Sequence, residues 1–140
     1  MAALAFVVGL EGGQRFTQGR HGIADPVRAD VARRSLPGQL RLRLVDSNDG
    51  CTPLAGYALY LWHCDRDGNY SMYQSASEAN YLRGVQPVDS KGLVTFTSIF
   101  PAAYSGRWPH AHFEVYPSVG AATSARKFVG TSPSATVLKK

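Results

Sequence analysis

The stretch Gln39–Leu44 reads QLRLRL, so a leucine alternates with a polar or basic residue at every step. Successive side chains of a β-strand point to opposite faces, and this alternation therefore puts three leucines on one face and two arginines on the other. Such a pattern is typical of a strand with one face in the core and one face in water. The stretch predicts a half-buried β-strand.

Further stretches carry strand patterns on either side of it. Tyr57–Trp62 is apolar on both faces, which is typical of a strand inside a sheet, while Leu93–Ile99 and His110–Tyr116 are two more short candidates. Turn signals such as Asn48–Gly50 and Asp67-Gly68 separate these runs, and no long helical pattern intervenes. The sequence therefore predicts an all-β fold, an antiparallel β-sandwich with long loops.

Length and composition restrict the class of protein. The chain has 140 residues, 44% hydrophobic and 18% charged, which suits one folded domain and excludes a disordered or fibrous protein. The formal net charge of +5 favours anionic ligands. Because the basic residues are scattered and form no Lys/Arg-rich block, we expect no nucleic-acid partner.

The two cysteines, Cys51 and Cys64, are predicted to be unpaired thiols. They flank the strand predicted at Tyr57–Trp62, and an extended strand of that length separates its two ends by about 20 Å, well beyond disulfide reach.

The N-terminal part of the chain differs from the rest in composition. Residues 1–24 contain five glycines among polar residues and are predicted to form a flexible N-terminal arm. Residues 1–10 are apolar, but they are too short to cross a bilayer and carry no basic n-region, so we expect no membrane partner. The sequence leaves the cellular location unknown, with the cytoplasm slightly favoured and secretion open.

The stretch Arg107–Phe113, RWPHAHF, carries two histidines one residue apart. On a strand, His110 and His112 point to the same face with Cβ atoms about 7 Å apart. Two imidazoles at that separation can bind one ion, each at roughly 2.1 Å. The spacing alone is weak, because two histidines on one strand face are more often surface or hydrogen-bonded core residues than ligands.

Other motifs occur in a definite order around this stretch. They are residues 51–56 (CTPLAG), 62–71 (WHCDRDGNYS), 81–86 (YLRGVQ) and 99–107 (IFPAAYSGR). Together with the histidines, this series resembles the intradiol ring-cleavage dioxygenases, the catechol and protocatechuate dioxygenase family, over about residues 36–116. The resemblance implies that residues 25–140 form a single catalytic β-sandwich domain.

The resemblance also implies a cofactor and a reaction. The family's iron ligands match Tyr70, Tyr104, His110 and His112, which implies a non-haem Fe(III) ion, and phenolates are hard oxygen donors that favour trivalent iron. The implied reaction uses O2 to cleave a catechol-type aromatic between its two hydroxyls, giving a muconate-type diacid. Tyr104 is implied as the ligand that leaves and accepts a proton, and Arg107 as the residue that stabilises charge on the substrate. A homo-oligomer is compatible with this interpretation.

Neighbouring residues are given other roles. Glu114 shares the histidine face, but it lies about 13 Å along the strand from His110, too far to share an ion. Arg83 is expected to be structural and to pair with a carboxylate such as Asp65 or Asp89, and His63 is expected beside the site without being a ligand. The remaining tyrosines are interpreted as structural: Tyr57, Tyr60, Tyr73, Tyr81 and Tyr116.

The chain also departs from the family pattern. Ala102 and Ala103 replace the usual glycine and aromatic residue before the second tyrosine, and Thr123–Arg126 offers no glutamine where the family often has one. The alternative hypothesis is therefore a non-catalytic β-sandwich binding module, with or without a bound metal. The sequence does not identify which catechol is the substrate.

Overall fold

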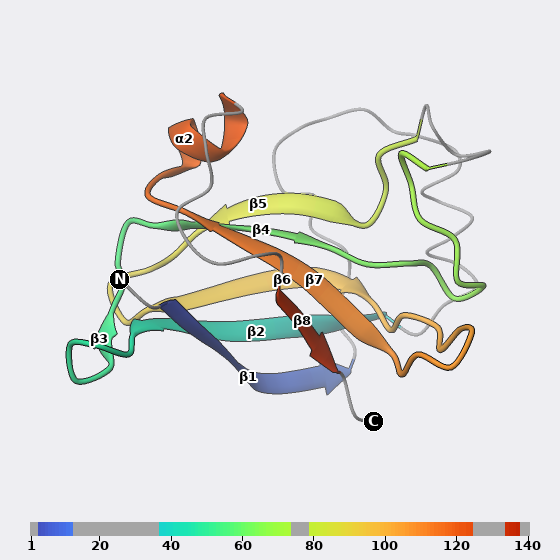
Figure 1. Ribbon diagram of the computed structural model, residues 1–140, viewed down its shortest axis with the longest axis horizontal. Helices are drawn as coiled ribbons and strands as arrows, with labels where there is room; N and C mark the ends of the chain where they lie inside the picture. Colours follow the sequence, from blue (N-terminus) through green and yellow to red (C-terminus); the bar gives the residue numbers. More distant parts are fainter. Residues whose placement is uncertain (1–2, 13–36, 74–78, 125–133, 138–140) are drawn as a thin grey trace.

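A computed structural model describes residues 3–12, 37–73, 79–124 and 134–137 of the chain. The strands form two antiparallel sheets that face each other (Figure 1). Sheet A has the order β1-β2-β3, with β6 also paired to β2, and sheet B has the order β5-β4-β7-β8. The elements are β1 Ala3–Gly12, β2 Pro37–Asp46, β3 Thr52–Pro53, β4 Ala58–Trp62, β5 Arg83–Pro87, β6 Leu93–Ile99, β7 His110–Tyr116, α2 Val119–Thr123 and β8 Ser134–Val137.

The core lies between the two sheets and is built from alternating residues of their strands. Leu40, Leu42 and Leu44 of β2 point inward, as the alternation in the sequence predicts, while Arg43 on the opposite face is exposed. Each buried leucine contributes about 1.5–3 kcal/mol to the free energy of unfolding. The core cluster consists of Leu40, Leu42, Leu44, Leu54, Leu59, Leu61, Val88, Val94, Phe96, Ala111, Phe113 and Val115.

The predicted all-β sandwich is confirmed. β6 and β7 have the bounds expected from the sequence, and β4 lies between β5 and β7, as expected for a run that is apolar on both faces. β7 turns Ala111, Phe113 and Val115 into the core, so its histidines point away from it on the outer face of sheet B.

The N-terminal segment differs from the flexible arm expected over residues 1–24. Residues 3–12 form β1, which pairs antiparallel with β2 from Ala3↔Asp46 to Gly12↔Gly38. The apolar residues at positions 3–8 favour a strand, and β2 offers them an edge with unpaired backbone groups. Residues 13–24 and the domain boundary predicted at residue 25 lie outside the described residues.

Four other short elements were not expected from the sequence, among them the two-residue β3 that pairs with β2. β5 and β8 complete sheet B, and α2 begins after Ser118, whose Oγ accepts a hydrogen bond from the Ala121 backbone N–H at 3.1 Å. They span five residues or fewer, too few for a reliable periodic pattern. Among the described residues, no helix combines the length and the apolar character needed to span a bilayer.

Gly92, at the turn before β6, is expected to tolerate no side chain. Its φ is +80°, and an added Cβ would lie 2.7 Å from the Leu44 carbonyl oxygen. Gly92→Ala is therefore expected to lower the free energy of unfolding by about 2–3 kcal/mol, since left-handed strain alone costs 1–2 kcal/mol. Urea denaturation measures this loss. Gly50→Ala is the control, because Gly50 has φ +55° but open space around it; an equal loss in both variants would contradict the steric explanation.

Candidate metal centre

The four predicted ligand side chains come from three segments that meet at one end of the sandwich. His110 and His112 lie on β7, Tyr70 follows β4 in the loop to β5, and Tyr104 lies in the loop from β6 to β7. Both loops lie at the end where β7 begins (Figure 1). The sheets therefore supply a rigid base, and the two loops bring the phenols over the histidine pair.

The functional atoms of these four residues converge. Tyr70 Oη lies 3.0 Å from Tyr104 Oη and 3.3 Å from both His110 Nε2 and His112 Nε2. Tyr104 Oη lies 3.5 Å from His110 Nε2. Residues that are up to 42 positions apart in the sequence thus place two oxygens and two nitrogens around one point.

These distances fit a shared metal ion. Donors that bind one ion at about 2.1 Å are about 3.0 Å apart at right angles and about 3.4 Å apart in a tetrahedron, which follows from the bond length alone. In the part of the chain that the structure describes, no three His, Cys, Asp or Glu side chains are grouped to hold a metal. An ion at this point would therefore depend on the two phenols as well as the two imidazoles.

The hydrogen bonding of His110 leaves the correct nitrogen free for a metal. Its Nδ1 lies 2.7 Å from the carbonyl oxygen of Trp108, and because a carbonyl only accepts, Nδ1 carries the proton and donates. The neutral ring then has its lone pair on Nε2, which faces the two phenols. A backbone acceptor that holds the second nitrogen is a common support for a metal-binding histidine.

Burial favours the neutral forms of both His112 and Tyr70. Burial lowers the pKa of His112, and the charges of His110 and Arg107 lower it further, so the imidazole stays in the neutral form that binds metals. Burial, followed by the hydrogen bond to Tyr104, raises the pKa of Tyr70 well above its ordinary value. Without a cation Tyr70 is a neutral phenol, and a bound trivalent ion would supply the charge that favours its phenolate.

Asp65, which the sequence interpretation did not include in the site, organises the loop before Tyr70. Its side chain is buried, and Oδ1 accepts hydrogen bonds from the backbone N–H groups of Asp67 and Asn69, both at 2.9 Å. The Asp65 carbonyl accepts from Ala102 N–H at 3.1 Å, which joins this loop to the loop of Tyr104. Aspartate side chains often accept a hydrogen bond from the backbone N–H two residues on, so Asp65 just ahead of the Asp67-Gly68 turn signal could have identified this role from the sequence.

The two loops also approach each other closely at Gly68. This residue has φ +88°, and a Cβ added there would lie 3.3 Å from the Tyr104 Cβ. Glycine is required both by the left-handed backbone and by the space that Tyr104 occupies. The glycine in the 62–71 motif thus shapes the path of the chain past the second phenol.

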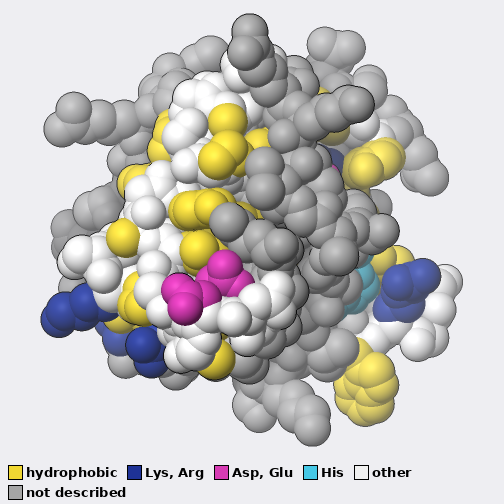
Figure 2. All heavy atoms as spheres, turned by 60° about the vertical axis from the view of Figure 1, so that its left-hand side comes forward, with side chains coloured by type: hydrophobic (Ala, Val, Ile, Leu, Met, Phe, Trp, Pro, Cys, Tyr) yellow, Lys and Arg dark blue, Asp and Glu magenta, His cyan; other side chains and the backbone are white. Residues whose placement is uncertain are grey.

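Arg107 is held close to the four residues by a tight hairpin. Tyr104 N–H donates to the Arg107 carbonyl at 3.1 Å, and Arg107 N–H donates back to the Tyr104 carbonyl at 2.7 Å, with two residues between them. The Arg107 side chain is exposed, and its charge acts on both Tyr70 and His112. Figure 2 shows a histidine side chain at the surface beside a basic side chain at one edge of the molecule.

Arg83 does not form the expected pair with Asp65 or Asp89. Its guanidinium donates hydrogen bonds to Ser71 and Tyr60, and none of the described carboxylates bonds to it. Asp65 is instead occupied by the loop amides, and Asp89 caps the turn before β6 with the backbone N–H groups of residues 91 and 93. The pairing prediction is therefore wrong for this residue.

The predicted non-ligand Glu114 bonds to a residue outside the cluster. Glu114 accepts a hydrogen bond from Tyr116 Oη at 2.7 Å. Cys51 is exposed and Cys64 is buried, and both are free thiols, as predicted.

His63 lies behind the site and joins the two sheets. It is 2% exposed; Nδ1 donates to the Cys64 carbonyl at 2.7 Å, so Nε2 accepts from Ser98 Oγ of β6, also at 2.7 Å. Burial lowers its pKa to about 4, outweighing the opposing effects of the Cys64 carbonyl and of Asp65. His63 is therefore a neutral structural histidine beside the candidate centre.

The buried His63 predicts a loss of stability in mild acid. Its pKa is about 6.5 in the unfolded chain and about 4 in the folded protein, so the unfolded chain binds the proton more readily. The stabilisation that comes from keeping His63 neutral is complete above pH 6.5. It is lost as the pH falls from 6.5 to 4, which lowers the free energy of unfolding by about 3 kcal/mol. Urea denaturation across this range measures it. His63→Gln should flatten the pH dependence; an unchanged slope in that variant would assign the effect to other groups.

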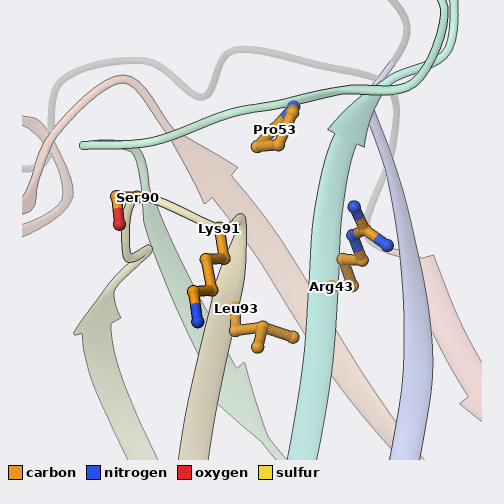
Figure 3. Close-up of a pocket in the computed structure, with 5 residues that line it drawn as sticks. All are labelled: Arg43, Pro53, Ser90, Lys91 and Leu93. Atoms are coloured by element: carbon orange, nitrogen blue, oxygen red, sulfur yellow. The ribbon is translucent and has the colours of Figure 1, made fainter.

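A separate hollow of about 500 Å³ lies on sheet A. Arg43, Pro53, Ser90, Lys91 and Leu93 line it, as Figure 3 shows. Leu93 is the first residue of β6, whereas the loop that carries Tyr104 follows the last residue, Ile99. The hollow is therefore at the opposite end of that strand from the candidate metal centre.

Comparison with known proteins identifies the same part of the chain. Residues 33–124 match the model of a protein family described as "Dioxygenase". An 82-residue stretch is 37% identical to a chlorocatechol 1,2-dioxygenase of Rhodococcus opacus, covering 56% of this chain and 30% of that protein. A 53-residue stretch is 36% identical to catechol 1,2-dioxygenase 2 of Acinetobacter lwoffii, covering 38% of this chain and 19% of that protein.

A solved structure also aligns with part of the chain. An intradiol ring-cleavage dioxygenase from Tetranychus urticae aligns with 34% sequence identity and a TM-score of 0.47, covering 51% of this chain and 40% of that chain. The present chain thus spans less than a third of the length of the two curated relatives it matches. The match to the family model nevertheless includes both loops and the strand that form the candidate metal centre.

Proposed function

Because this chain belongs to the intradiol ring-cleavage dioxygenase family, we propose that it binds a non-haem ferric ion and cleaves a catechol-type aromatic with O2. The proposed ligands are Tyr70, Tyr104, His110 and His112. The ring would open between its two hydroxyls to give a muconate-type diacid. The names of both curated relatives, a chlorocatechol and a catechol dioxygenase, support this class of substrate.

One observation carries the proposal. Tyr70 Oη lies 3.0–3.3 Å from the Tyr104 oxygen and from both imidazole Nε2 atoms, and Tyr104 Oη lies 3.5 Å from His110 Nε2. Such a donor set suits a hard trivalent cation: the phenols provide the anionic charge, and the neutral imidazoles complete the coordination. A ferric ion held there would bind both oxygens of a catechol and make its ring reactive towards dioxygen.

The residues of the chain would then bind the substrate and move its protons. A catechol must lose its hydroxyl protons to bind through both oxygens, and Tyr104 Oη is the proposed acceptor of one of them. Tyr104 suits this role because it sits on a short hairpin and contacts only one imidazole, whereas Tyr70 contacts both. Arg107, at the other end of the hairpin, would donate hydrogen bonds to the negative charge that develops on the substrate.

Reconstitution with iron tests the proposal directly. The purified protein would be loaded with ferric iron, its visible spectrum recorded, and catechol added without oxygen before air is admitted. We expect a broad phenolate-to-iron band, a shift to longer wavelength with catechol, and ring-opened diacid once oxygen is present. A protein that stays colourless with iron would contradict the metal assignment. A coloured protein that releases no diacid would favour the alternative, a metal-containing binding module.

Tyr104→Phe separates the two proposed phenolate ligands. We expect this variant to keep the Tyr70 contribution, and therefore to remain weakly coloured, while turnover of catechol falls because the proton acceptor is lost. Visible spectroscopy and oxygen uptake measure the two effects. Tyr116→Phe is a matched control, since the hydroxyl of Tyr116 bonds to Glu114 and not to the four proposed ligands. Equal spectra in the wild type and in Tyr104→Phe would remove Tyr104 from the ligand set.

A further inference from the structure

We propose that Arg83 is a positioning residue that orients Tyr70 and His112 relative to each other in the candidate metal centre. The inference rests on the proposed function, because it assigns these two residues to one metal ion. Arg83 itself forms no hydrogen bond to Tyr70 or to His112 among the described contacts. It acts through Ser71, next to Tyr70 in the chain, and through Trp62, which packs on His112.

The first set of Arg83 contacts holds the segment that contains Tyr70. Arg83 Nε donates to Ser71 Oγ at 3.0 Å, and Nη2 donates to the Ser71 carbonyl at 2.7 Å. A planar guanidinium that bonds the side chain and the backbone of one residue defines its orientation more strictly than a single hydrogen bond. Ser71 is 1% exposed, so these bonds are protected from competing water. The backbone directly after Tyr70 is thereby tied to β5.

The second set of Arg83 contacts extends to His112 across the outer face of sheet B. Arg83, Trp62 and His112 are cross-strand partners on β5, β4 and β7, in that order. The Arg83 guanidinium lies 5.9 Å from the Trp62 ring centroid, and the Trp62 and His112 rings are stacked at 5.0 Å with an interplanar angle of 15°. The stack restricts the rotation of the imidazole, and the cation over the indole restricts the indole in turn.

Two aromatic neighbours hold the guanidinium itself in place. Arg83 Nη1 donates to Tyr60 Oη at 3.1 Å, and the Tyr60 ring stacks on Trp62 at 5.3 Å. The guanidinium also lies 5.4 Å from the Tyr73 ring, which meets the Tyr70 ring edge-on at 6.1 Å. Arg83 therefore contacts supporting partners of both Tyr70 and His112, and its loss would remove support from both ligands at once.

Hydrogen exchange of the protein before iron is added tests the positioning without relying on the metal. In Arg83→Gln, peptides covering residues 69–73 are expected to exchange faster than in the wild type, because the tie to Ser71 is lost. Arg43→Gln is the matched control, since Arg43 is an exposed arginine on sheet A at the opposite end of β6 from the Tyr104 loop. Equal exchange in Arg83→Gln and the wild type would overturn the proposal.

Ferric titration then measures the consequence for the metal. Arg83→Gln is expected to weaken iron binding about 10- to 100-fold and to move the phenolate-to-iron band, since supporting residues of this kind typically have effects of that size. Arg83→Lys keeps the positive charge but lacks the planar set of N–H donors, so its iron affinity and band position should be intermediate. If iron gives colour in the wild type and the same band and affinity in Arg83→Gln, the positioning role fails while the proposed function stands. If the wild type stays colourless, the proposed function fails, and the exchange result still decides whether Arg83 holds the loop.

Tyr60→Phe provides a second variant should Arg83→Gln not fold. It removes only the hydrogen bond to Nη1 and keeps the ring stacked on Trp62. We expect a smaller shift of the band in the same direction, with the thermal midpoint of unfolding almost unchanged. A band identical to that of the wild type would count against the proposal, because a purely structural Arg83 would leave the spectrum unaffected.

Discussion

Replacing Arg107 by glutamine is expected to lower kcat for catechol by about 10²- to 10³-fold, the usual cost of removing one donor to a developing negative charge. The physical reason is that the hairpin from Tyr104 to Arg107 brings a cation near the proposed ligands, where its charge acts on Tyr70 and His112. Because Arg107 is not a proposed ligand, the ferric protein should keep its colour. Steady-state oxygen uptake and the visible spectrum give the two readouts.

The size of the Arg107 effect distinguishes a catalytic from a surface role. Arg107→Lys should recover part of the rate, since it restores the charge but not the planar donor group. Arg43→Gln, an exposed arginine on sheet A, should leave kcat unchanged. If Arg107→Gln behaves like this control, Arg107 is a surface residue and the proposed charge stabilisation is wrong.

Replacing His112 by alanine is expected to weaken ferric binding by more than about 100-fold, since loss of a ligand should exceed the 10- to 100-fold effect typical of supporting residues. His112 Nε2 is 3.3 Å from Tyr70 Oη, and its removal leaves at most three donors for the ion. Metal analysis after dialysis against a chelator, together with the phenolate-to-iron band, measures the loss.

A neighbouring position on the same strand supplies the control. Glu114 follows His112 on the same face of β7 and bonds to Tyr116, so Glu114→Gln should bind iron like the wild type. Iron binding by His112→Ala at the level of this control would exclude His112 as a ligand. A loss in both variants would instead indicate that the outer face of sheet B no longer folds correctly.

The sequence by itself determined the fold class and the strand that carries the histidines. Alternating leucines at positions 40, 42 and 44 predicted one buried face of β2, and the His-x-His spacing placed both imidazoles on one face of β7. These are local properties, because a strand has a two-residue period whatever surrounds it. β1 was not predicted, since its pairing depends on the free edge that β2 offers.

Only the tertiary structure decided how the two tyrosines approach the histidines and what supports them. Seven tyrosines are equivalent by residue type, and the family motifs alone singled out Tyr70 and Tyr104. Their approach to within 3.0 Å depends on how two loops fold over the end of a sheet, and Asp65 and Gly68 shape those loops through contacts with distant residues. The partners of Arg83 were likewise mispredicted, because charge suggests a carboxylate, whereas packing across three strands provides Ser71, Tyr60 and the Trp62 ring. Such contacts join positions far apart in the chain, and no local sequence pattern encodes them.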